Sequence, residues 1–264
     1  MGQTLGRLYK IDEIRGATLI SMILYHFMWD LKYIAGFEME WYESIFAHVW
    51  QKSICITFIL ISGFCFSLSR NHLKRGLITF FSGGLVTLVT LLVMPENRVV
   101  FGILTFIGTA MLIMIPISKA HKYIGERINR DTLNITMLIA SMLFFIVFYS
   151  VNYGFLNFIF TKVNIPRHMC KGYLADYIGF TDPTFYSTDY FSIFPWMFLF
   201  MFGYYLYEVI KPLNTSDADS MIIRFLKSKN SRAFEAIGKR TLIIYLLHQP
   251  VLYLITIIIM NFCR

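Results

Sequence analysis

Charged residues are scarce in this chain. They make up 15% of its 264 residues, whereas soluble domains carry roughly 25%. Hydrophobic residues make up 56%, and the mean hydropathy is +0.58. Apolar runs such as ICITFILISGFCFSL and TLIIYLLHQPVLYLITIIIM are continuous. A spanning β-barrel would instead show segments of about 10 residues with alternating polarity. The composition therefore predicts an integral membrane protein built of helices.

The sequence also lacks the short motifs of several enzyme classes. It has no Walker loop, no GxGxxG after a strand, no HExxH and no GxSxG, which argues against an ATP-driven pump and the usual serine or zinc hydrolases. Its four cysteines have no metal-ligand spacing, so we expect no metal. We interpret Cys55 and Cys65 as packing residues, and leave open a disulfide between Cys170 and Cys263.

Seven apolar segments are long enough to cross a bilayer, which needs roughly 20 residues. They predict an all-α, polytopic transmembrane bundle that forms a single domain over residues 1–264. The expected spans are 17–35, 50–69, 76–95, 99–118, 132–151, 188–210 and 241–262. The longer connections are 36–49 and 152–187, both rich in aromatic residues.

Lys and Arg are unevenly divided between the two sets of connections. Of the 24, 17 precede the first span or lie in the 70–75, 119–130 and 211–240 connections, and 7 lie on the other side. The positive-inside rule then places the N-terminus in the cytoplasm and, with seven spans, the C-terminus outside. The charge of +8 is thus a matter of topology, and no basic motif with interleaved aromatics indicates nucleic-acid binding.

Ionisable residues inside a membrane are functional candidates. His26 and Asp30 lie four residues apart in the first span, so they share one helix face. A carboxylate beside an imidazole raises its basicity and fixes its tautomer, which suits a general base. The alternative is a structural hydrogen bond between helices. His48, at the entrance of the second span, is a further candidate base, or else an interfacial histidine beside Lys52.

Two further spans hold polar residues next to a proline. His248 and Gln249 precede Pro250 in the last span, and Asp189 and Trp196 lie at the outer start of the sixth. Such a break often lines a cavity. We take Asp189, Trp196, His248 and Gln249 as candidate substrate-binding residues, with satisfaction of the proline kink as the alternative for the last pair.

Basic residues gather at the predicted inner ends of the spans. Arg15 precedes the first span and can pair with Asp12, while Arg70, Lys74 and Arg75 lie between the second and third. These cations suit the phosphates of a nucleotide-bearing cofactor. Lipid headgroups are the alternative partner. The small residues Gly102, Thr105, Gly108 and Thr109 of the fourth span permit close helix packing.

Five segments together resemble a known family. They are RLYKIDEIRGATLISMILYHFMWDL, FILISGFCFSLSR, VVFGILTFIGTAML, DYFSIFPWMFLFMFGYYL and IGKRTLIIYLLHQPVLY. In order and spacing they are similar to the catalytic domain of heparan-α-glucosaminide N-acetyltransferase and its bacterial relatives, in the transmembrane acyltransferase superfamily. The opening RxxxxDxxRG also begins the acyltransferase-3 proteins.

The resemblance implies transfer of an acetyl group from cytoplasmic acetyl-CoA to an acceptor on the far side. It aligns His26 with an active-site asparagine of the animal enzyme and makes His48 a candidate for its catalytic histidine. Bacterial relatives often read GILH where this chain has GILT, ending at Thr105. We expect a short chain of the bacterial type, without the animal enzyme's luminal domain, so heparan need not be the acceptor.

We therefore expect a membrane-embedded acetyltransferase of a bacterial inner membrane, acting on an amine or hydroxyl of a sugar or envelope glycan. The base is His26 or His48, Asp30 orients it, and Arg15, Arg70, Lys74 and Arg75 meet the CoA phosphates. Transfer is direct or passes through an acetyl-histidine. A small proton-coupled transporter using His26 and Asp30 is the alternative, although no internal repeat supports it. A homodimer is left open.

Overall fold

The structure is a computed structural model that describes residues 7–158, 161–166, 171–214 and 220–262. Cys170 and Cys263 lie outside these residues. The chain forms two compact units. Unit 1 holds residues 1–58 and 213–264, and unit 2 holds residues 59–212, so α2 (Ile45–Phe64) is shared between them. The single domain expected from the sequence stays a prediction.

Unit 1 combines the two ends of the chain. The long helix α1 (Tyr9–Tyr33) is followed by the short 3₁₀ turn η1 (Glu40–Glu43) and by α2. The C-terminal part adds α8 (Met221–Lys227), α9 (Arg232–Lys239) and α10 (Thr241–Phe262). The Trp50 indole N–H donates to Ser21 Oγ at 2.7 Å, and the Tyr42 hydroxyl donates to the Tyr25 carbonyl at 3.3 Å. These contacts fix the start of α2 antiparallel to α1.

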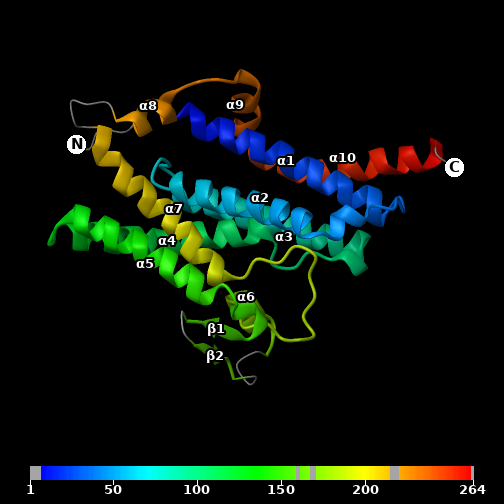
Figure 1. Cartoon of the computed structure of the whole chain (residues 1–264), viewed down its shortest axis with the longest axis horizontal. Helices are drawn as coiled ribbons and strands as arrows, with labels where there is room; N and C mark the ends of the chain where they lie inside the picture. Colours follow the sequence, from blue (N-terminus) through cyan, green and yellow to red (C-terminus); the bar gives the residue numbers. More distant parts are fainter. Residues whose placement is uncertain (1–6, 159–160, 167–170, 215–219, 263–264) are drawn as a thin grey trace. The chain divides into compact units, whose positions relative to one another are not determined.

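Helices α1 and α10 run side by side in the same direction (Figure 1). Gly16 of α1 lies against α9, just before α10 begins, and a Cβ atom there would come within 2.1 Å of the Phe234 carbonyl oxygen. Further along, His26 meets His248 and Asp30 meets Gln249. Both helices therefore run in the same direction through unit 1. If α1 is the first span and α10 the last, this parallel arrangement requires an odd total number of spans.

Unit 2 holds the remaining helices. The elements before its outer connection are α3 (His72–Val93), η2 (Pro95–Asn97), α4 (Ile103–Gly125) and α5 (Arg130–Phe148). Helix α7 (Ile193–Ile210) then packs antiparallel to α5, with Asn134 near Glu208 and Phe148 near Phe194. The 3₁₀ turn η5 (Lys211–Asn214) follows α7.

Close packing of α3 on α4 depends on glycine. A Cβ atom at Gly108 would lie 2.4 Å from the Phe80 backbone nitrogen, and one at Gly83 would lie 2.4 Å from that of Thr105. The small-residue track expected in the fourth span, which includes Gly108 and Thr105, is therefore confirmed as a packing surface.

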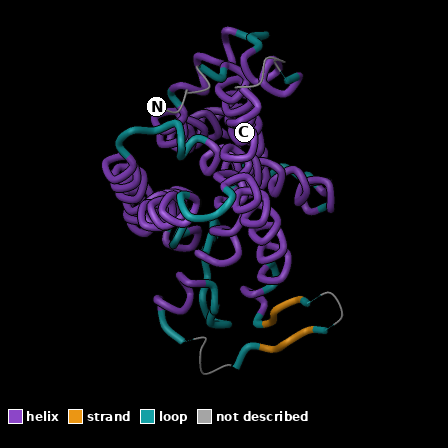
Figure 2. The backbone as a smooth tube through the Cα atoms, turned by 90° about the vertical axis from the view of Figure 1, so that its left-hand side faces the viewer, coloured by secondary structure: helices purple, strands orange, loops and turns teal. Residues whose placement is uncertain are grey.

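The 152–187 connection is more ordered than the sequence suggested. It contains η3 (Val151–Tyr153), a two-stranded antiparallel hairpin of β1 (Phe155–Asn157) and β2 (Lys162–Asn164), and the short helix α6 (Tyr173–Ile178). Figure 2 shows the two strands in orange. Three residues per strand leave too few alternating positions for a periodic signal. All the other regular elements of the described chain are helices, which confirms an all-α bundle.

Six of the seven expected spans are helices long and apolar enough to cross a membrane: α2, α3, α4, the α5–η3 segment, α7 and α10. Helix α1 is not among them, although its 25 residues suffice in length. His26, Asp30 and Lys32 lower its hydropathy. Its parallel packing against α10 supports its assignment as the remaining span. The orientation, N-terminus in and C-terminus out, stays a prediction.

Candidate active site

A polar cluster of buried and half-buried side chains joins α1 to α10 in unit 1. It consists of His26 and Asp30 from α1 and His248 and Gln249 from α10, and is called the α1–α10 cluster below. All four were singled out from the sequence, two as catalytic and two as substrate-binding candidates. The structure brings the two pairs together, although Asp30 and Gln249 lie 219 residues apart.

Asp30 is the centre of this cluster. Its side chain has no exposed surface, and Gln249 Nε2 donates a hydrogen bond to its Oδ1 at 2.7 Å. A carboxylate only accepts, so the amide of Gln249 must turn its NH₂ group toward Asp30. Asp30 Oδ2 and Gln249 Oε1 are then left buried with no hydrogen-bond partner among the described residues. Such atoms are costly in a fold, and their presence often marks a site of function.

His248 has a defined tautomer. Its Nδ1 hydrogen-bonds the backbone carbonyl of Tyr245, one turn earlier in α10. A carbonyl oxygen only accepts, so Nδ1 carries the proton and Nε2 of the neutral ring holds a free lone pair. Within the described part of the chain, this buried Nε2 has no partner. The arrangement leaves His248 ready to accept a proton.

His26 lies beside His248, with the ring centroids 5.0 Å apart and an angle of 61° between the ring planes. The described hydrogen bond of Asp30 goes to Gln249 and not to His26. The expected role of Asp30 as the group that orients His26 therefore stays a prediction. What the structure adds is a second imidazole in contact with the first.

His48 lies in the first turn of α2 with an exposed side chain. No hydrogen bond, ion pair or ring contact among the described residues joins it to His26 or Asp30. Its assignment as a catalytic base rests on the sequence and stays a prediction.

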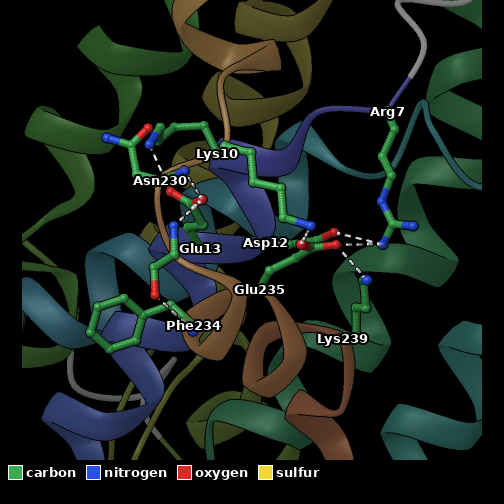
Figure 3. A network of polar contacts seen from close by, with 10 residues as sticks. Arg7, Lys10, Asp12, Glu13, Asn230, Phe234, Glu235 and Lys239 are labelled. Carbon is green, nitrogen blue, oxygen red and sulfur yellow. Dashed lines mark hydrogen bonds and ion pairs between the residues drawn. The ribbon is translucent and has the colours of Figure 1, made fainter.

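A second polar network joins the start of α1 to the connection between α8 and α9 and to α9 itself (Figure 3). Glu13 accepts hydrogen bonds from Lys10 Nζ at 2.6 Å and from the backbone N–H groups of Asn230 at 2.6 Å and Ser231 at 2.9 Å. These bonds, that of Lys10 foremost, lower the pKa of Glu13 from 4.5 to about 2.

Glu235 is the counterpart of Glu13 on α9. It pairs with Lys229, Lys239 and Arg7. The hydrogen bonds from Lys229 and then Lys239 lower its pKa from 4.5 to about 2. Neither glutamate was singled out from the sequence. The segment around Glu235 carries no motif, and Glu13 accepts backbone N–H groups of that same segment, which no sequence pattern indicates. Glu13 and Glu235 both fix the connection into α10, the helix that supplies half of the α1–α10 cluster.

Arg15 belongs to the same region. Its Nη1 donates to Asp12 Oδ1 at 3.3 Å and to the Gly238 carbonyl at 3.4 Å. The expected Asp12–Arg15 pair is therefore confirmed, and it ties α1 to the end of α9. Arg15 as a ligand of CoA phosphate stays a prediction.

The other cofactor candidates lie in unit 2. Arg70, Lys74 and Arg75 have exposed side chains around the first turn of α3, where the neighbouring His72 ring stacks on Phe66 at 4.1 Å between centroids. Exposed cations beside a helix N-terminus fit the charge of phosphate groups. Their role in binding CoA stays a prediction.

Asp189 and Trp196, the remaining substrate-binding candidates, have structural contacts in unit 2. Asp189 Oδ2 accepts the Ile103 N–H at 3.2 Å and so caps the first turn of α4. Trp196 is buried between Phe191 and Phe145, with centroids 5.0 and 5.8 Å away. Asp189 thus has a structural role through a hydrogen bond, and Trp196 has one through packing. A role of either residue in binding substrate stays a prediction.

One buried group in unit 2 was missed from the sequence. The Glu208 carboxylate, at the end of α7, accepts from Ser67 Oγ at 3.0 Å and pairs with Arg130 at 3.2 Å. Glu208 stands inside the apolar run FGYYLYEVI, and a carboxylate within an apolar run could have marked it as a candidate from the sequence. Among the described residues, no group of three or more His, Cys, Asp or Glu side chains is placed to hold a metal.

Comparison with known proteins identifies the family. The model of the family described as heparan-alpha-glucosaminide N-acetyltransferase, catalytic, matches residues 7–250. This match covers α1 to α9 and includes every residue of the α1–α10 cluster. No curated protein and no solved structure gives a significant match. The chain belongs to the family of the catalytic domain of heparan-alpha-glucosaminide N-acetyltransferase.

Proposed function

We propose that this chain is a membrane acetyltransferase that moves an acetyl group from cytoplasmic acetyl-CoA to an amine or hydroxyl of a sugar or envelope glycan. The acceptor binds at the α1–α10 cluster, and the membrane is the inner membrane of a bacterium. Family membership supports acetyl transfer, and the resemblance of the opening motifs supports acetyl-CoA as the donor. The acceptor class and its position rest on the chemistry of the cluster.

One observation carries the assignment of the site. Asp30 Oδ2, Gln249 Oε1 and His248 Nε2 are three buried acceptor atoms without a hydrogen-bond donor among the described residues. A ligand that brings N–H or O–H groups would satisfy them, whereas an apolar or anionic ligand would not. An amine or hydroxyl of a sugar is such a ligand.

The residues then divide the work of the reaction. Asp30 and Gln249 hold the acceptor through its N–H or O–H groups, and His248 Nε2 takes the proton as the acceptor nitrogen or oxygen attacks the thioester carbon. The new C–N or C–O bond forms, the C–S bond breaks, and the proton passes from His248 to the departing CoA thiolate. His26, in ring contact with His248, positions it. This refines the expectation of His26 or His48 as the base.

The donor requires a cationic site on the cytoplasmic side. We assign the CoA phosphates to Arg70, Lys74 and Arg75, whose exposed side chains share one end of α3. Arg15 contributes less, because it already pairs with Asp12.

Acetyl transfer by purified protein tests the proposal. Protein in nanodiscs is given acetyl-CoA with glucosamine as the probe, and released CoA thiol and acetylated sugar are both measured. We expect the two products in equal amounts.

A binding experiment tests the site of the donor. Replacing Arg70, Lys74 and Arg75 together by Gln should weaken acetyl-CoA binding at least about tenfold. The variant Lys119→Gln/Lys122→Gln/Arg127→Gln is the matched control. No turnover with any amino sugar or polyol, and no binding of acetyl-CoA, would refute the proposal.

A proton-coupled transporter is the second candidate, because the α1–α10 cluster joins a fully buried carboxylate to two imidazoles inside the predicted spans. An assay of thioester turnover in detergent solution distinguishes the two functions. An acetyltransferase turns over there without any gradient, whereas a transporter consumes no thioester.

A further inference from the structure

A row of aromatic rings leads from the connection between α1 and α2 to the α1–α10 cluster. The Trp41 ring contacts the Tyr42 ring with 5.7 Å between centroids, and Tyr42 in turn contacts Tyr25 of α1 at 5.0 Å. Tyr25 lies edge-on to His26 at 6.1 Å, and His26 contacts His248 at 5.0 Å. These five rings, all in unit 1, are called the aromatic track below. The track joins an exposed turn of the chain to the site proposed for the acceptor.

The track is closed in its middle and open at its far end. Tyr42 is only 6% exposed, and its hydroxyl donates to the Tyr25 carbonyl at 3.3 Å, which fixes the ring against α1. Trp41 is 41% exposed, although its ring also stacks on that of Trp50 at an interplanar angle of 24°. Because Tyr42 and Trp50 already hold the Trp41 ring, a ligand that packs on its exposed part pays little for ordering the side chain.

The charge around Trp41 indicates the kind of ligand. Glu43 pairs with Lys32 Nζ at 2.7 Å. Glu38 and Glu40 have exposed side chains, and neither has an ion pair among the described residues. An indole beside carboxylates attracts a cation, through the face of the ring and through charge-assisted hydrogen bonds. The same carboxylates disfavour anionic lipid headgroups, the other usual partner of exposed aromatic residues near the end of a span.

The inner end of the track carries the unpartnered acceptor atoms of the α1–α10 cluster. Asp30 Oδ2 and His248 Nε2 are buried without a donor among the described residues. A glycan whose reacting sugar meets these atoms can extend its next residue toward Trp41.

We propose that Trp41 and Glu40 form a second sugar subsite, which binds an amino sugar residue next to the residue that is acetylated. The Trp41 indole packs against the sugar ring, and the Glu40 carboxylate binds its protonated amine. This inference rests on the proposed function and narrows it. The acceptor is then an oligosaccharide with amines on successive sugars, and Trp41 and Glu40 determine specificity without touching the reacting atoms.

Binding of a glucosamine trimer in the absence of acetyl-CoA tests the subsite. Full-length protein in phosphatidylcholine nanodiscs is titrated with the trimer and with the glucosamine monomer by calorimetry. We expect the trimer to bind more tightly. Trp41→Ala should weaken trimer binding about fivefold and leave monomer binding unchanged. Trp41→Phe should retain most of the affinity, and Tyr153→Ala, which removes an exposed aromatic ring from unit 2, is the matched control.

A fully N-acetylated trimer tests the carboxylate separately, because it has no amine to protonate. Glu40→Gln should weaken binding of the glucosamine trimer, while binding of the acetylated trimer and of the glucosamine monomer stays unchanged. Glu96→Gln in unit 2 is the charge control. In the transfer assay, Trp41→Ala should raise KM for the trimer and leave kcat unchanged, because Trp41 contacts a sugar that does not react.

Equal affinity for monomer and trimer in the unmodified protein overturns the subsite. So does a Trp41→Ala variant that binds the trimer normally but melts at a lower temperature, because Trp41 would then serve only packing or membrane anchoring. Acetyl transfer to the glucosamine monomer is measured on its own and decides the proposed function. The subsite can therefore fail while acetyl transfer stands, and binding at the subsite can be found where no transfer occurs.

Discussion

Gln249 Nε2 donates a hydrogen bond to Asp30 Oδ1 across 2.7 Å, and the carboxylate that receives it has no exposed surface. Removing one partner leaves the other buried and unsatisfied, whereas removing both can be nearly neutral. We therefore expect Gln249→Leu to lower the free energy of unfolding by about 1–3 kcal/mol. Asp30→Leu/Gln249→Leu should recover most of that loss.

Thermal unfolding of the single and double variants in the same nanodiscs measures this coupling. Asp30→Leu alone completes the cycle. If the two single losses simply add in the double variant, Asp30 and Gln249 act independently and the hydrogen bond does not join α1 to α10.

Two adjacent glycines of α3 give a sharper test of packing. A Cβ atom at Gly83 would lie 2.4 Å from the Thr105 nitrogen, whereas one at Gly84 would meet nothing within 4 Å. We expect Gly83→Ala to lower the melting temperature. Gly84→Ala should be neutral or stabilising by up to about 1 kcal/mol, because alanine favours the helix. Equal melting temperatures for the two variants would contradict the close approach of α3 and α4.

The pKa values of Glu13 and Glu235 predict acid sensitivity at the start of α1. Both are lowered from 4.5 to about 2, so the folded protein binds fewer protons than the unfolded chain in this window. Their stabilising contribution is complete above pH 4.5 and is lost as the pH falls toward 2. The protection factors of the amides of residues 229–239 against hydrogen exchange should fall over that window.

Glu235→Gln should flatten this pH dependence, because the variant has no carboxylate to protonate at that position. The exposed Glu96→Gln in unit 2 is the control and should leave it unchanged. A pH profile of Glu235→Gln that matches the unmodified protein would show that other groups control the docking of α9.

The sequence predicted the spans well because each is a continuous apolar run, and it located His26, Asp30, His248 and Gln249 because polar residues stand out in such runs. It could not join α1 to α10, since a contact across 219 residues leaves no local pattern. The docking of α8 and α9 was equally hidden. It depends on a Glu13 carboxylate that meets backbone N–H groups, and backbone groups carry no sequence signal.

The orientation of the chain is open to direct measurement. The excess of Lys and Arg in the 211–240 connection predicts that this connection is cytoplasmic and that 152–187 lies outside. In a background without native cysteines, Lys171→Cys should react with a membrane-impermeant thiol reagent in intact cells, and Arg232→Cys should react only after lysis. Labelling of Arg232→Cys in intact cells would reverse the orientation and move the proposed CoA site to the outer face.

Three histidine variants decide which imidazole is the base. A positioned base contributes about 10²–10⁴ in rate, and His248 has a fixed tautomer with a buried, unpartnered Nε2. His248→Ala should therefore remove most acetyl transfer while acetyl-CoA binding stays within a few-fold. His26→Ala should lower the rate less, because His26 positions the neighbouring ring across 5.0 Å. His48→Ala should turn over nearly normally, since its side chain is exposed on α2.

Single-turnover assays with acetyl-CoA separate the chemical step from binding. Loss of turnover in His48→Ala alone would place the base at the start of α2, and near-normal rates in all three variants would show that no histidine serves as the base.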